Sequence, residues 1–96
     1  MGSVMKLIEA VGKLDSFDNE ATIYAATPWT ENSEAIVARE PTSGGPPTEA
    51  EKLGLKYFLE VFVARDFLDG WSANLGATPA VQQRCSRLIQ YVLRDV

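Results

Sequence analysis

The stretch from Gly54 to Phe67, GLKYFLEVFVARDF, constrains the fold more than any other part of the chain. Read as a strand over residues 55–63, it carries an apolar residue at every odd-numbered position: Leu55, Tyr57, Leu59, Val61 and Val63. Alternate residues of a strand point to the same face, so this pattern predicts a strand with one face packed against helices. From about Ala64 the apolar spacing changes to that of a helix. The chain must therefore combine a sheet with helices.

The rest of the sequence predicts the order helix, strand, strand, short helix, strand, helix, helix. We expect the first helix to run through about residue 13, with Ser3 as its cap, and the first two strands to cover 21–26 and 35–39 and to form a hairpin. Residues 41–47 are rich in proline and glycine, which predicts an irregular connection before a short helical turn that begins at Thr48. The last two helices are separated by Gly76 and Pro79.

This order is typical of an α+β fold, with a short antiparallel three-stranded sheet and helices packed on one face. A length of 96 residues, 46% of them hydrophobic, predicts one domain over residues 1–96 with a single core. Met1-Gly2-Ser3 has the Gly-Ser pattern of a cloning remnant and is given no role.

Composition excludes several kinds of chemistry. The chain has no histidine, so it cannot supply an imidazole base, a Ser-His-Asp arrangement or the usual nitrogen ligand of zinc. Gly44 and Gly45 lie among prolines and do not form a phosphate-binding loop. We therefore expect a protein that is not an enzyme, without catalytic residues, cofactor or metal.

The sequence also predicts a cytoplasmic location. No apolar run approaches the roughly 20 residues needed to cross a bilayer, and the N-terminus lacks the pattern of a secretory signal. The single cysteine, Cys85, cannot form an internal disulfide, as expected in a reducing compartment, and its position on an apolar helical stripe predicts a buried structural residue.

Glu60 interrupts the apolar stretch and has to avoid an unpaired buried charge, which would cost several kcal/mol. Arg39 is the only cationic residue between Lys13 and Lys52, so a cross-strand pair between Arg39 and Glu60 on the open face of the sheet is the simplest solution. Three alternatives stay open. Glu60 could be hydrated on the open face without a partner, it could contact a ligand, or it could act as a catalytic acid or base.

Phe58 and Phe62 flank Glu60 on the face opposite the predicted core. Two phenylalanines on an open strand face would form an apolar patch of the kind that marks protein contacts. We expect one of two outcomes for this patch. Either it binds a second copy or another protein, or the loop and short helix of residues 41–53 cover it.

Charge is distributed unevenly along the chain. Between Asp15 and Glu51 there are eight acidic residues and Arg39 alone on the basic side, whereas from Gly70 to Arg94 there are three arginines and no acid. With a net charge of −4, such a surface disfavours nucleic acid and anionic membranes and favours a basic protein partner, with Glu31 and Glu34 as candidate contacts. The alternative is that the acidic surface serves only solubility.

The segments Pro28-Trp29-Thr30, Ala35 to Val37 and Gly54 to Val61 resemble a family of small bacterial domains of unknown function, over residues 14–75. The resemblance implies structural motifs and no catalytic residues. Small acidic α+β proteins of this kind are also similar to immunity proteins of bacterial toxin systems and to products of mobile gene cassettes.

Two functions follow as expectations. The first is a non-enzymatic protein-interaction domain, an immunity or antitoxin-like inhibitor that acts through its acidic surface and can form a homodimer. The second is a small-molecule binding domain, with a pocket near Tyr24, Trp29 and Glu60 in which Glu60 or Arg39 supplies the polar contact.

Overall fold

The computed structural model describes residues 4–95, with side chains for residues 4–94. The elements, in chain order, are β1 (Met5–Lys6), α1 (Leu7–Gly12), the 3-10 turn η1 (Leu14–Ser16), β2 (Ala21–Ala25), β3 (Glu34–Arg39), α2 (Thr48–Lys52), β4 (Lys56–Glu60), α3 (Val61–Leu75) and α4 (Val81–Asp95). The predicted α+β class is confirmed. The predicted cloning remnant at residues 1–3 and the predicted cap at Ser3 lie outside the described residues.

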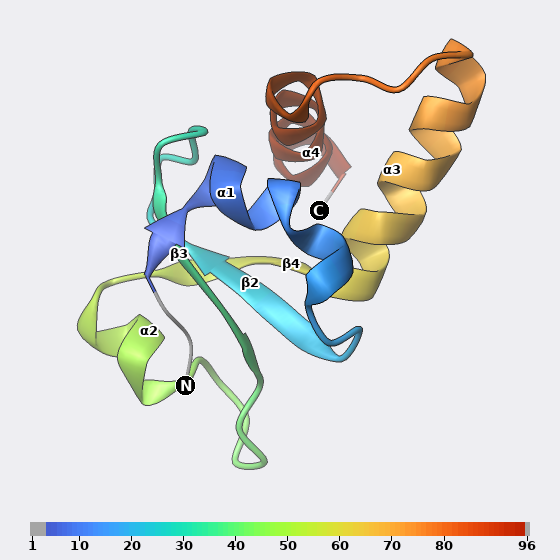
Figure 1. Ribbon diagram of the computed structural model, residues 1–96. Helices are drawn as coiled ribbons and strands as arrows, with labels where there is room; N and C mark the ends of the chain where they lie inside the picture. The colour runs from blue at the N-terminus through green and yellow to red at the C-terminus, as the bar shows by residue number, and fades with distance from the viewer. Residues whose placement is uncertain (1–3, 96) are drawn as a thin grey trace.

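The sheet has four antiparallel strands in the order β1-β3-β2-β4, so β3 and β2 are the inner strands (Figure 1). The predicted hairpin of β2 and β3 is confirmed, with Ile23 opposite Val37. The additional strand is β1, in which Met5 pairs with Ala35 at the edge of the sheet. The predicted first helix is present and ends at Gly12, but it begins only at Leu7, because Met5 and Lys6 pair with β3.

The three longer elements of the helical layer, α1, α3 and α4, cover one face of the sheet, and α2 lies on the opposite side (Figure 1). The main core forms under α1, α3 and α4. Its fully buried residues include Leu7, Val11, Ile23, Val61 and Leu88. A smaller cluster lies on the other side of the sheet, which we call the second face; it consists of Tyr24, Ile36, Ala50 and Leu55.

β4 contains a bulge that decides which of its side chains enter the core. Leu59 is opposite Ile23, but the next pair is Tyr57 with Tyr24, so Phe58 is an extra residue in the ladder. Directly opposed residues share a face, which places Leu59 with the main core and Tyr57 on the second face. The extra residue, Phe58, is also buried in the main core, where it is 0% exposed.

The same region corrects the predicted end of this strand. β4 ends at Glu60 and α3 begins at Val61, three residues earlier than expected, because Val61, Ala64 and Leu68 form one buried helical face. Gly76 ends α3 with a φ of 69°, a left-handed conformation that favours glycine. None of the helices within the described residues is both long and apolar enough to cross a membrane.

Candidate functional site

The structure does not bring the eight predicted site residues together. Tyr24 lies on the second face, whereas Trp29 and Phe58 belong to the main core. Phe62 is in the first turn of α3 and is 47% exposed. The prediction of an open-face patch formed by Phe58 and Phe62 was wrong, because the bulge turns Phe58 inward and the early helix removes Phe62 from the strand.

Trp29 has a structural environment. Its indole Nε1 donates a hydrogen bond to the carbonyl oxygen of Ala25 at 3.2 Å, and its ring meets Phe58 edge-to-face with 5.2 Å between centroids. The predicted pocket between Tyr24 and Trp29 does not form, since the two rings belong to clusters on opposite faces of the sheet.

The predicted Arg39–Glu60 pair was also wrong, because β2 lies between the two strands that carry these residues. Arg39 instead donates from Nε to Asp18 Oδ2 at 2.9 Å, and its Nη1 is 3.7 Å from Glu20 Oε1. The pKa of Asp18 is lowered by the backbone N–H of Glu20 and by the Arg39 guanidinium. All three side chains are exposed, so this network contributes little to stability.

The second face contains a hollow of about 400 Å³, inside the range of small-ligand pockets. It forms between strands β2 and β4, the end of β3, helix α2 and the loop that joins β3 to α2. The lining residues are Tyr24, Glu40, Gly45, Pro46, Glu51, Gly54, Leu55, Lys56 and Tyr57. We call this hollow the tyrosine pocket.

Local sequence explains how the walls of this pocket form. β3 ends at Arg39, shortly before Pro41, and Gly45, with a φ of 77° ahead of Pro46 and Pro47, turns the loop sharply. Ala50 is the buried residue of α2 and packs with Tyr24 on the second face. Gly54, with a φ of 71°, ends this short helix and directs the chain into β4.

The electrostatic character of the tyrosine pocket is acidic. Burial and the Glu40 carboxylate raise the pKa of Tyr24. Burial raises the pKa of Tyr57 as well, with further contributions from Glu60, Glu40 and Tyr24. Within residues 4–94, no ion pair involves Glu40 or Glu51. The one cationic residue of the lining is Lys56, so the pocket keeps an excess of negative charge.

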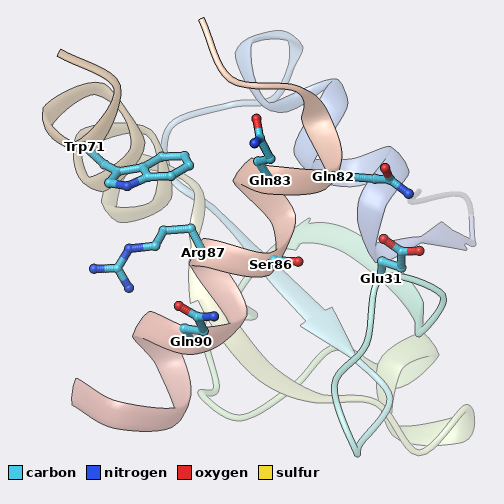
Figure 2. Close-up of a pocket in the computed structure, with 7 residues that line it drawn as sticks. All are labelled: Glu31, Trp71, Gln82, Gln83, Ser86, Arg87 and Gln90. Carbon is cyan, nitrogen blue, oxygen red and sulfur yellow. The ribbon is translucent and has the colours of Figure 1, made fainter. Parts of the chain in front are cut away.

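A second hollow, of about 490 Å³, lies over the outer surface of α4 (Figure 2). Its lining consists of Glu31, Trp71, Gln82, Gln83, Ser86, Arg87 and Gln90. Figure 2 shows Trp71 and Glu31 on opposite sides of α4, so this hollow is an open surface and not an enclosed pocket. Of the predicted site residues, Glu31 is the one that lines it.

The single thiol is not part of either hollow. Cys85 is 0% exposed in α4, and burial raises its pKa to about 11. A thiol that is both covered and protonated at neutral pH is a poor nucleophile. The prediction of a buried structural cysteine is confirmed.

Sequence reasoning missed Glu40, Glu51, Lys56 and Tyr57 as pocket residues. Both glutamates contributed to the acidic segment, but no local motif distinguished them, and Tyr57 was assigned to the core face. Glu34, at the start of β3, does not line the pocket. Glu60 does not line it either, but its negative charge contributes to the raised pKa of Tyr57. Among the described residues, no group of three or more acidic or cysteine side chains is arranged to hold a metal ion.

No protein-family model, no curated protein and no solved structure matches the chain. The geometry of the tyrosine pocket is therefore the guide to function.

Proposed function

We propose that this protein is a non-enzymatic binding protein whose tyrosine pocket accepts a cationic side chain of a basic partner protein. The observation that carries the proposal is a hollow of about 400 Å³ in which two tyrosines meet two carboxylates that lack an ion pair within residues 4–94. Binding without catalysis agrees with a chain that has no histidine.

A lysine or arginine side chain fits this chemistry in two ways. Its charge is attracted by Glu40 and Glu51, and its apolar stem and charged head can pack against the exposed part of the Tyr57 ring. Tyr57 is 49% exposed, so an incoming side chain can reach the pocket from solvent. Lys56 offsets part of the negative charge and is the expected competitor of the incoming cation.

The acidic surface outside the pocket favours a protein as the source of this cation. Asp18 and Glu20 are exposed beside Arg39, at the end of the β2–β3 hairpin from which the chain enters the pocket residue Glu40. Glu49 is on α2 beside the pocket. Such a surface raises the rate at which a basic partner arrives, in a way that salt suppresses. The role of an immunity or antitoxin-like inhibitor of a basic protein fits this arrangement.

A free organic amine is the second candidate, because the pocket has the volume of a small-ligand site. The two candidates differ in the part of the protein surface that each would contact. A protein partner would use both the pocket and the acidic surface, whereas an amine would use the pocket alone and bind with a weak dependence on salt.

We expect the full chain to bind tri-arginine and tri-lysine, measured by titration calorimetry at low ionic strength, and not to bind tri-glutamate. Affinity for the basic peptides should fall at least tenfold between about 20 and 200 mM salt, because exposed charges are screened. Binding of monovalent organic amines as tight as that of the basic peptides, with a shallower dependence on salt, would favour the small-molecule alternative. No binding of any cation would reject the proposal.

A further inference from the structure

Gly70 lies in the middle of α3, where glycine weakens a helix by about 1 kcal/mol relative to alanine. Its position is exposed, and a Cβ built on it would meet no atom within 4 Å. Packing inside the described molecule therefore does not require a glycine here. A glycine that weakens its helix and that no internal contact requires can still serve a contact with another molecule, because the missing side chain lets a second backbone approach closely.

Gly70 belongs to a stripe of exposed residues on α3. Asp66 precedes it by four positions and Asn74 follows it by four, which places the three residues on one helical face. They line a hollow of about 430 Å³ between α3 and α4, together with Phe67, Trp71 and Arg87. The tyrosine pocket shares no residue with this hollow.

Arg87 supplies an available positive charge at the edge of this stripe. Its guanidinium lies 5.1 Å from the centroid of the Phe67 ring, which in turn stacks on Tyr91 with 4.3 Å between centroids. Within residues 4–94, Arg87 forms no ion pair. Figure 2 shows it extending from α4 on the same side as Trp71.

We propose that this stripe is the contact between two copies of the chain, in which the two α3 helices run antiparallel and cross at Gly70. A two-fold axis at Gly70 places Asp66 of each copy opposite Asn74 of the other, because both are four residues from the centre. The Asp66 carboxylate accepts a hydrogen bond, and the Asn74 amide donates one. The stripe is thus complementary to itself.

Charge complementarity favours a second copy over an unrelated helix. Asp66 and Arg87 line the same hollow without forming an ion pair, so each is available to the opposite charge of the other copy. Because of the two-fold symmetry, each contact that Asp66 makes with Asn74 or Arg87 of the other copy forms twice. At the crossing point, glycine lets the two helix backbones approach more closely than larger residues would.

Replacement of Gly70 by alanine separates this proposal from a purely structural role. We expect Gly70→Ala to raise the melting temperature of the monomer, because alanine favours the helix, and to weaken self-association at least tenfold, because two methyl groups meet at the crossing. Gly70→Leu should give a monomer. Sedimentation equilibrium measures both effects against Asp69→Ala, an exposed change on α3 outside the stripe, which should leave association unchanged.

A cysteine substitution tests the geometry directly. Gly70→Cys should weaken the non-covalent contact as alanine does, but it places the new thiol next to the same thiol of the other copy whenever two chains meet. Mild oxidation should therefore trap linked chains, whereas Asp69→Cys should not link. The native Cys85 thiol is buried and does not interfere. A wild-type protein that remains monomeric at the highest attainable concentration, or equal cross-linking of both variants, would overturn the proposal. Binding of tri-arginine is independent of this outcome.

Discussion

Replacement of Phe58 by alanine should lower the free energy of unfolding by about 3–5 kcal/mol, a large share of the 5–15 kcal/mol that holds a domain of this kind together. Phe58 is 0% exposed and packs edge-to-face against Trp29, so its removal leaves a cavity in the main core. The measurement is urea unfolding followed by circular dichroism.

The neighbouring residue provides a matched control for this prediction. Tyr57 is 49% exposed on the second face, and Tyr57→Ala should cost about 1 kcal/mol or less. A simple alternating strand would give the reverse order, with Tyr57 in the core and Phe58 outside. A larger loss for Tyr57→Ala than for Phe58→Ala would therefore contradict the bulge in β4.

Charge reversal in the tyrosine pocket should have the largest effect on binding. The double variant Glu40→Lys/Glu51→Lys replaces two attractive charges by two repulsive ones, and we expect its affinity for tri-arginine to fall about 100-fold, or roughly 2.7 kcal/mol. Both residues are exposed, so the variant should melt within a few degrees of the wild type. Calorimetry measures the affinity.

The control is Glu31→Lys/Glu34→Lys, which changes the net charge by the same amount at acidic residues outside the pocket. If net charge alone attracts the peptide, both double variants should lose the same affinity. The proposal expects the control to lose less than about threefold, because these charges act only through screened long-range steering.

The sequence predicted well those elements in which apolar residues recur at regular spacing over several helical turns or several strand residues. The hairpin of β2 and β3 and the two last helices have such patterns, and the structure contains them. β1 was missed because a strand of two residues carries no periodicity. The bulge at Phe58 was missed because an alternating pattern does not mark an extra residue; Leu59 stays on the predicted core face, but Tyr57, before the bulge, lies on the opposite one.

The tyrosine pocket was beyond sequence reasoning for a related reason. Tyr24 and Tyr57 are separated by 33 positions and meet because of the register between β2 and β4, which the bulge shifts. Glu40 and Glu51 reach the same hollow only after the loop of residues 41–47 turns back over the second face. An alternating pattern can assign a face, but it cannot predict a register.

The most direct test of the account is a titration of the isotopically labelled full chain with tri-arginine, followed by nuclear magnetic resonance. We predict saturable shifts of the backbone and ring signals of Tyr24 and Tyr57 and of the amides of Glu40, Gly45 and Glu51. Signals of α4 should not move. Shifts centred on α3 and α4, or the absence of any saturable shift at the tyrosine pocket, would contradict the claim that this pocket binds cationic side chains.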